Sequence, residues 1–131
     1  FLPVRADSLD AHEMHAERYV VSDTACATIQ KARAEGRPIV AVGTTVTRTL
    51  EAVVAAHGAL VPDAGETRLF IRPGWRFEVV DQLLTNFHLP RSTLLMLVSA
   101  LLGRERTMAA YAEALTAGYR FYSYGDGMWA R

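Results

Sequence analysis

The stretch LTNFHLPRSTLLMLV, residues 84–98, decides the fold of this chain. It begins as a short apolar run, crosses a polar turn and continues as an apolar helix. Pro90 fixes its own φ and disfavours helical backbone in the residue before it, so the helix is predicted to begin at or just after Pro90. Ser92 or Thr93 can then offer a hydroxyl oxygen to the free N–H groups of the first helical turn.

Nearly every residue from Leu94 to Leu102 is apolar, which predicts a helix that is buried on all sides. A membrane span needs about 20 apolar residues, so this run is too short to be one. A buried strand and a buried helix therefore meet at a turn that carries Asn86, His88 and Arg91. Because ligands of open α/β sheets bind at the carboxyl ends of strands, we expect these side chains to bind a ligand. The alternative is a hydrogen-bond network that only joins the strand to the helix.

The composition fits one globular domain, or one large piece of a bigger domain, because half of the 131 residues are hydrophobic. The 14 basic and 14 acidic residues give a net charge of zero. A stand-alone nucleic-acid-binding protein usually has a basic excess, so an RNA partner would need local patches or another segment. The single Cys26 excludes an intrachain disulfide and fits the cytoplasm. The sequence contains no targeting peptide or membrane span, and because it starts at Phe1 we expect it to be part of a longer protein.

Strands and helices are predicted to alternate along the chain, which indicates an α/β fold. Strands are expected at residues 19–21, 37–42, 69–71, 75–80 and 119–124, besides the one that ends near residue 86. Helices are expected at residues 23–35, 46–57, 91–102 and 104–117, and residues 62–65 are expected to form a loop. Residues 19–42 fit a right-handed βαβ unit. We therefore predict a layered α/β/α domain around a mostly parallel sheet. In the last helix, Met108, Tyr111 and Leu115 are expected to face the core.

Two histidines near the start of the chain are candidates for chemistry. His12 and His15 share a face if they lie on a helix, where Glu13 or Glu17 could orient an imidazole. The pair could act as a general base or contact an anion, and the alternative is a solvated, polar start of a helix. A metal site is not expected, because the pair lacks a convincing third ligand.

The segment Gly43-Thr44-Thr45 follows a predicted buried strand and precedes a helix. Its N–H groups and hydroxyls can hold a phosphate, a carboxylate or a ribose oxygen, and Arg48 lies one turn further into the helix. The segment has neither the Gly-Lys-Ser/Thr signature of a P-loop nor the three spaced glycines of a dinucleotide fold. The alternative is a plain turn with a threonine cap.

Three residues near the end of the chain could also take part. The aromatic side chains of Tyr122 and Tyr124, which precede Asp126, could stack on a nucleic-acid base. The alternative is that these tyrosines pack in the core.

Eight segments, in order along the chain, carry a resemblance to a known family: residues 1–5, 12–17, 41–45, 48–51, 69–74, 85–90, 92–98 and 119–126. Together they resemble the C-terminal part of the bacterial S-adenosylmethionine:tRNA ribosyltransferase-isomerases of the queuosine pathway. The tail departs from the family pattern, with Gly127 where alanine is usual and Trp129-Ala130-Arg131 in place of an aliphatic ending.

The resemblance implies that residues 1–131 are the C-terminal portion of an α/β catalytic domain in a larger two-domain enzyme. The N-terminal portion and an inserted β-barrel domain would be absent. The implied reaction moves and isomerises the ribosyl group of S-adenosylmethionine onto 7-aminomethyl-7-deazaguanine in the tRNA anticodon loop, giving epoxyqueuosine and releasing adenine and methionine. The implied partners are S-adenosylmethionine, as a co-substrate without a further cofactor, and precursor tRNA. We expect a cytoplasmic monomer.

That reaction needs a base for the C5′ proton beside the sulfonium, a proton or hydrogen-bond donor for the departing adenine, and groups that hold hydroxyls and a carboxylate. We expect His12, His15 and His88 to transfer protons. Thr44, Thr45 and Arg48 suit the methionine carboxylate or ribose oxygens, and Arg5 and Arg91 suit phosphates of the anticodon loop. The other residues expected to bind substrate are Glu17, Gly43, Asn86, Ser92, Tyr124 and Asp126.

Two other functions fit part of this pattern. One is a non-catalytic fragment or paralogue that binds RNA or a nucleotide, although zero net charge argues against a strong RNA module acting alone. The other is an ordinary methyltransferase, although the sequence has no glycine-rich loop after its first strand and no acidic residue at the end of the next. A methylated product would support the methyltransferase, whereas release of adenine would exclude it.

Overall fold

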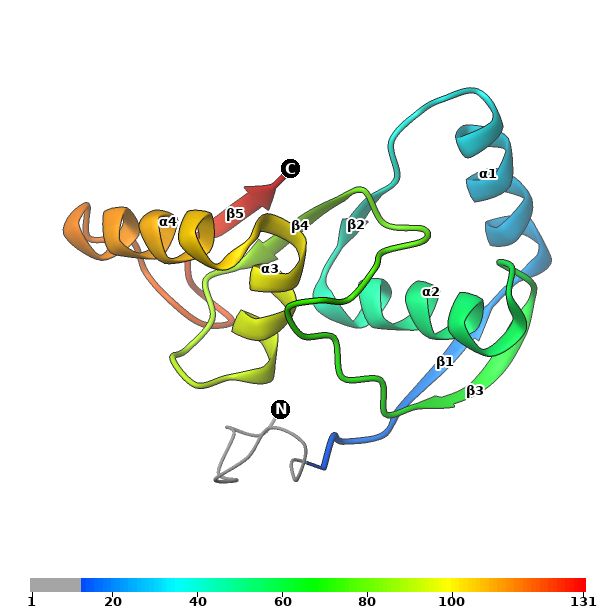
Figure 1. The fold of residues 1–131 in the computed structure, drawn as a ribbon, viewed down its shortest axis with the longest axis horizontal. Coiled ribbons are helices and arrows are strands. Elements are labelled where there is room, and N and C mark those ends of the chain that lie inside the picture. Colours follow the sequence, from blue (N-terminus) through cyan, green and yellow to red (C-terminus); the bar gives the residue numbers. More distant parts are fainter. Residues whose placement is uncertain (1–12) are drawn as a thin grey trace.

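The computed structural model describes residues 13–131, in which helices and strands are intermixed (Figure 1). The element order is β1 (Glu17–Val21), α1 (Asp23–Ala34), β2 (Val40–Val42), α2 (Thr44–His57), β3 (Asp63–Thr67), β4 (Gln82–Asn86), α3 (Thr93–Leu102), α4 (Arg104–Thr116) and β5 (Gly127–Ala130). The predicted α/β class is confirmed. None of the helices between residues 13 and 131 is long and apolar enough to cross a membrane.

The larger of the two sheets has the strand order β2-β4-β5. β2 and β4 run parallel, with Ala41 opposite Leu83, whereas β5 runs antiparallel to β4 and places Ala130 opposite Leu83. A separate antiparallel pair joins β1 to β3. Within the described part of the chain, one of the three strand pairs is therefore parallel and two are antiparallel, so the pairing is more mixed than the mostly parallel sheet predicted from the sequence.

The βαβ unit predicted for residues 19–42 is not formed, because β1 and β2 lie in different sheets. β1 instead pairs with residues 63–67, part of which the sequence predicted to be a loop. Most of these residues are polar or glycine, which usually form turns, and only Thr67 among them is buried. Because this strand lacks a buried apolar face, the pattern of hydrophobic residues did not reveal it.

The strands predicted at residues 69–71 and 75–80 are also wrong, since both segments are irregular. Val79 and Val80 are buried, as an apolar strand would require. Their N–H groups are bound by the Glu51 carboxylate of α2 rather than by a neighbouring strand. Glu51 is 1% exposed, and it also accepts hydrogen bonds from the backbone N–H of Glu78 at 2.9 Å and from Trp75 Nε1 at 3.3 Å. One buried carboxylate thus shapes the whole segment before β4.

The C-terminal quarter differs from prediction in two details. The last strand is β5, and residues 119–124 form a loop before it. On α4, Tyr111 is buried as predicted, but Met108 and Leu115 are exposed. The buried residues of α4 are Thr107, Tyr111 and Ala114, which are four and three positions apart and therefore share one face of the helix. The buried face of α4 therefore excludes Met108 and Leu115, although these are large apolar residues.

The helix starts agree well with the sequence. Ser22 caps α1 and Ser92 caps α3, and each side chain accepts a hydrogen bond at 3.1 Å from the backbone N–H three residues later. α3 begins at Thr93, after Pro90, and every residue of this helix is buried or partly buried. α2 begins at Thr44, two residues earlier than predicted, with Gly43 as its N-cap.

The core lies on one face of the larger sheet. Ala41, Leu83 and Ala130 are buried and belong to the main hydrophobic cluster with residues of α2 and α3 such as Val53 and Leu97. Alternate residues of the same strands point to the other face, which exposes Val40, Val42, Leu84 and Trp129. A smaller aromatic cluster, centred on Phe87 and Tyr111, joins the end of β4 to α4.

We predict that Glu51→Gln lowers the free energy of unfolding by about 3 kcal/mol. The glutamine side chain has one acceptor oxygen where the carboxylate has two, and its NH₂ group would face N–H groups that now donate to Glu51. Urea unfolding followed by circular dichroism measures this value. Glu66→Gln is the matched control, since Glu66 is about half exposed and pairs with Arg18 on the surface, and we expect it to cost less than about 1 kcal/mol. Equal losses in the two variants would contradict the role given to Glu51.

Candidate functional site

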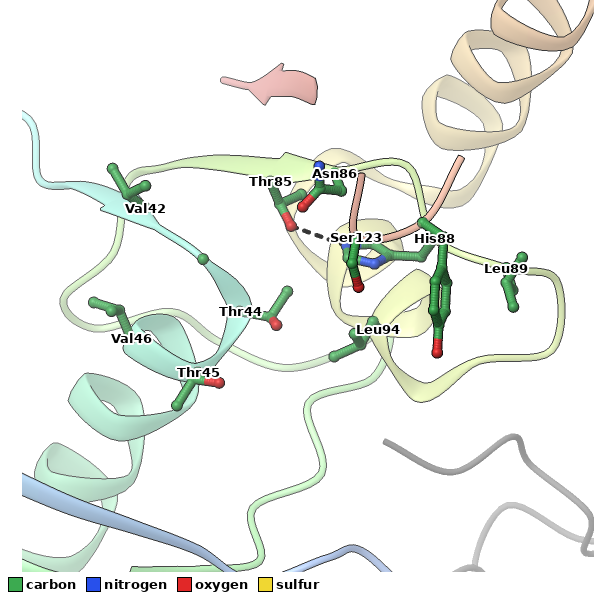
Figure 2. A pocket seen from close by; sticks show the side chains of 12 residues that line it. Val42, Thr44, Thr45, Val46, Thr85, Asn86, His88, Leu89, Leu94 and Ser123 are labelled. Atoms are coloured by element: carbon green, nitrogen blue, oxygen red, sulfur yellow. Dashed lines mark hydrogen bonds between the residues drawn. The ribbon is translucent and has the colours of Figure 1, made fainter. Parts of the chain in front are cut away.

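A cavity of about 280 Å³ opens at the carboxyl ends of β2 and β4. Because these strands are parallel, their carboxyl ends lie at the same edge of the sheet, where open α/β sheets usually bind ligands. The lining residues come from the start of α2, the turn after β4, α3 and the C-terminal loop: Val42, Gly43, Thr44, Thr45, Val46, Thr85, Asn86, His88, Leu89, Leu94, Tyr122 and Ser123. Figure 2 shows Thr44 and Thr45 on one side and Thr85, His88 and Ser123 on the other.

The first wall is the turn from β2 into α2. Gly43 has φ 98°, a conformation that other residues rarely adopt, and its N–H donates to the carbonyl oxygen of Leu84 at 2.9 Å. This bond continues the β2–β4 pairing beyond the last residue of β2. Thr44 and Thr45 follow as the first residues of the helix, where free N–H groups and the helix dipole favour negatively charged oxygens.

The second wall carries His88. Its side chain is 9% exposed, its Nε2 lies 3.0 Å from Thr85 Oγ1, and its backbone N–H donates to the Tyr111 hydroxyl at 2.9 Å. Burial lowers the pKa of His88 to about 4, since the charged imidazolium loses its hydration. The ring is therefore neutral at neutral pH, and it can accept a proton or donate a hydrogen bond according to its tautomer.

The third wall is the loop of residues 120–126, which closes on itself. The backbone N–H of Arg120 donates to the Asp126 carboxylate at 2.7 Å, and the N–H of Asp126 donates back to the carbonyl oxygen of Arg120 at 2.8 Å. Only glycine fits at position 125 in the middle of the loop, because a Cβ there would lie 2.5 Å from the Arg120 carbonyl oxygen. Tyr122 has φ 76°, which costs a bulky residue about 1 kcal/mol or more.

The family model described as queuosine biosynthesis protein matches residues 1–130 of this chain. The chain belongs to this family. A relative from Sorangium cellulosum, named S-adenosylmethionine:tRNA ribosyltransferase-isomerase, is 59% identical over 133 residues, which cover all of this chain and 36% of the relative. A relative of the same name from Moorella thermoacetica is 57% identical over 128 residues, covering 98% of this chain and 37% of its own.

The crystal structure of an S-adenosylmethionine tRNA ribosyltransferase from Thermotoga maritima is similar to this fold. The TM-score is 0.81 at 47% sequence identity, and the match covers 86% of this chain and 39% of that one. The chain thus spans little more than a third of the length of these family members.

Five of the residues predicted for the site line the cavity together. They are Gly43, Thr44, Thr45, Asn86 and His88. Two segments about 40 positions apart in the sequence thus converge at the carboxyl ends of the parallel strands β2 and β4. Asn86 is partly buried, and its amide Nδ2 lies 3.5 Å from the Gly125 carbonyl oxygen, so it also contacts the C-terminal loop.

Arg48 and Glu17 contact each other beside the cavity. Arg48 is 3% exposed, its Nη1 lies 2.8 Å from Glu17 Oε2, and its Nε donates to the Leu69 carbonyl oxygen at 2.9 Å. Burial lowers the pKa of Arg48, and the Glu17 carboxylate opposes this effect. Thr45 Oγ1 lies 3.5 Å from the other oxygen of Glu17. This ion pair therefore connects β1 to the first turns of α2. Neither residue lines the cavity.

The other predicted site residues that the structure describes do not line the cavity. Ser92 is buried as the cap of α3, and Asp126 closes the C-terminal loop. Arg91, with φ 55°, and His15 are exposed, and Tyr124 is 97% exposed. Arg5 and His12 lie outside the described residues.

The cavity also contains Tyr122, which the sequence offered as a possible stacking residue, and Thr85 and Ser123, which it did not single out as binding substrate. The sequence shows that Thr85 and His88 are three residues apart. It does not show that the chain turns so that the Thr85 hydroxyl contacts the His88 ring. The backbone conformation of Tyr122 leaves no mark in the sequence. Within residues 13–131, no three histidine, cysteine or acidic side chains form a group that could hold an ion.

The lowered pKa of His88 predicts how stability depends on pH. Native His88 stays neutral until about pH 4, whereas the unfolded chain takes up this proton near pH 6.5. Between these values the unfolded state binds one more proton than the native state. The free energy of unfolding therefore decreases as the pH is lowered, by up to about 1.4 kcal/mol per pH unit. We expect His88→Gln to remove this part of the acid sensitivity in urea unfolding.

The exposed His15 provides the control for this measurement. His15→Gln is expected to keep the wild-type dependence on pH. Equal dependence in wild type and His88→Gln would contradict the neutral, buried state of His88.

Proposed function

We propose that this chain is the C-terminal portion of the α/β catalytic domain of an S-adenosylmethionine:tRNA ribosyltransferase-isomerase. The proposed reaction transfers and isomerises the ribosyl group of S-adenosylmethionine onto 7-aminomethyl-7-deazaguanine in the tRNA anticodon loop, giving epoxyqueuosine and releasing adenine and methionine. One observation carries the proposal: in a chain of this family, the Gly43-Thr45 turn and the Asn86-His88 corner line one cavity at the edge of a parallel strand pair.

His88 is the proposed proton acceptor. Loss of the C5′ proton beside a sulfonium needs a base that is unprotonated at neutral pH, and the lowered pKa keeps the imidazole in that form. Thr85 holds one ring nitrogen at 3.0 Å, which limits rotation of the ring. His15, and His12 outside the described residues, remain candidates for the proton that departing adenine requires.

The start of α2 is the proposed site for the oxygens of the co-substrate. Thr44 and Thr45 bring two hydroxyls to a helix N-terminus, where a carboxylate or ribose oxygens find hydrogen-bond donors. Arg91 is exposed at the turn before α3 and suits a phosphate of the anticodon loop. With a net charge of zero, the chain has no basic excess of its own to attract tRNA.

We further propose that the N-terminal portion of the longer enzyme, with its inserted β-barrel domain, completes this domain. The exposed apolar face of the larger sheet supports this proposal, since Val40, Val42, Leu84 and Trp129 would otherwise meet water. Val42 also lines the cavity, so a segment on this face would extend one of its walls. The complete enzyme is proposed to act as a cytoplasmic monomer.

The test incubates full-length protein that carries this chain with S-adenosylmethionine and precursor tRNA. We expect stoichiometric release of adenine and a nucleoside mass that corresponds to epoxyqueuosine. His88→Ala should lower turnover about 10²-fold, the usual scale for a lost acid–base group. The control is His57→Gln, because His57 lies at the far end of α2 and contacts Asp63 outside the cavity.

Two results would contradict this assignment. A methylated nucleoside formed without adenine would identify a methyltransferase. Near-wild-type turnover by His88→Ala would leave His88 a structural role only.

A further inference from the structure

Tyr122 lines the cavity, whereas four neighbouring aromatic residues pack together. Phe87, Tyr111, Tyr119 and Phe121 pack against one another with ring centroids 5.2–5.9 Å apart. Tyr122 takes no part in that cluster: its side chain is 50% exposed and lines the cavity. Its large ring is therefore available to a ligand. Core packing does not explain why an aromatic residue lies at this position.

The loop holds Tyr122 in this place by backbone bonds. The Tyr122 N–H donates to the Phe87 carbonyl oxygen at 2.9 Å, and the Tyr122 carbonyl oxygen accepts from the Gly125 N–H at 2.9 Å. These bonds maintain the left-handed φ of 76°, which a tyrosine adopts only where its surroundings enforce it. Because Phe87 precedes His88, these bonds hold the backbone of Tyr122 close to the residue that carries the imidazole.

Both sides of the cavity combine polar and apolar residues. Thr44 and Thr45 offer hydroxyls at the start of α2, and Leu89 and Leu94 lie on the side of His88 and Ser123 (Figure 2). A nucleoside can use both kinds of group, since it has a flat base at one end and hydroxyls at the other. Bases stack on aromatic side chains because every base has a π-face.

We propose that Tyr122 is a stacking platform for a purine-type base, which lies against the 120–126 loop while the polar part of the ligand faces Thr44 and Thr45. The inference rests on the proposed function and adds the orientation of the ligand. Two purine-type bases occur in the proposed reaction, the adenine of S-adenosylmethionine and the 7-deazaguanine of tRNA. The shared chemistry is a flat heterocycle, and the experiment distinguishes the two sources.

The test measures binding to full-length protein that carries this chain by titration calorimetry. The probes are S-adenosylmethionine, adenosine, methionine, and an RNA stem-loop that contains 7-aminomethyl-7-deazaguanine. Tyr122→Gly removes the ring and accepts a positive φ, so we expect an unfolding temperature no lower than that of the wild type. For ligands whose base stacks on Tyr122, the affinity should fall about 5- to 100-fold.

Three comparisons control this measurement. Tyr122→Phe keeps the ring and should keep the wild-type affinities. Methionine has no base, so Tyr122→Gly should bind it as the wild type does. Met108→Ala truncates a side chain that is also 50% exposed, on α4 and outside the cavity lining, and should change none of the affinities.

Each outcome decides the inference. A loss for S-adenosylmethionine and adenosine assigns the stacked base to the co-substrate, and a loss for the stem-loop alone assigns it to tRNA. Unchanged affinity of Tyr122→Gly for every base-containing probe, or an equal loss for methionine, would overturn the stacking role while leaving the proposed function intact. A wild-type protein that binds none of the probes would instead refute the proposed function, and the inference with it.

Discussion

The parallel pairing of β2 with β4 is the constraint on which the site depends. It places the end of β2 beside the end of β4, and the N–H of Gly43 extends the pairing by one bond to Leu84. Two turns that are far apart in the sequence thereby become the facing walls of one cavity. An antiparallel pairing of the same strands would place these turns at opposite edges of the sheet.

The neighbouring strand gives the site its third wall. β5 pairs with β4 on the side away from β2, so the loop that precedes β5 returns to the carboxyl end of β4. Phe87 joins the two: its carbonyl oxygen accepts from Tyr122, and its N–H donates to the carbonyl oxygen of Asp126 at 3.3 Å. His88 follows directly in the chain. The imidazole and the C-terminal loop are therefore positioned by one residue, whose ring is anchored in the aromatic cluster.

The sequence revealed those parts of the fold that local chemistry determines. The start of α1 at residue 23, the start of α3 soon after Pro90 with Ser92 as one of its two candidate caps, and the apolar α3 itself follow from the preferences of single residues. It did not reveal parts that depend on distant partners. The chain near Val79 and Val80 satisfies its N–H groups with a glutamate 28 or more positions earlier, and β3 pairs through its backbone with few buried side chains. Gly43 and His88 were predictable as site residues because each follows a predicted strand, whereas nothing in the sequence distinguished Tyr122, which lines the cavity, from Tyr124, which does not.

Arg48 illustrates how spacing along a helix can suggest a ligand contact that burial then modifies. It lies four residues after Thr44 and so on the same side of α2, but the guanidinium lies in the protein interior. A buried charge is tolerated only with a partner, and Glu17 provides it at 2.8 Å. One more donor, Nη2, has no partner among the described residues. Because Glu17 also contacts Thr45, the ion pair connects β1 to the wall where the co-substrate oxygens are proposed to bind. A contact of Arg48 with substrate therefore stays a prediction, whereas its support of the cavity wall follows directly from these bonds.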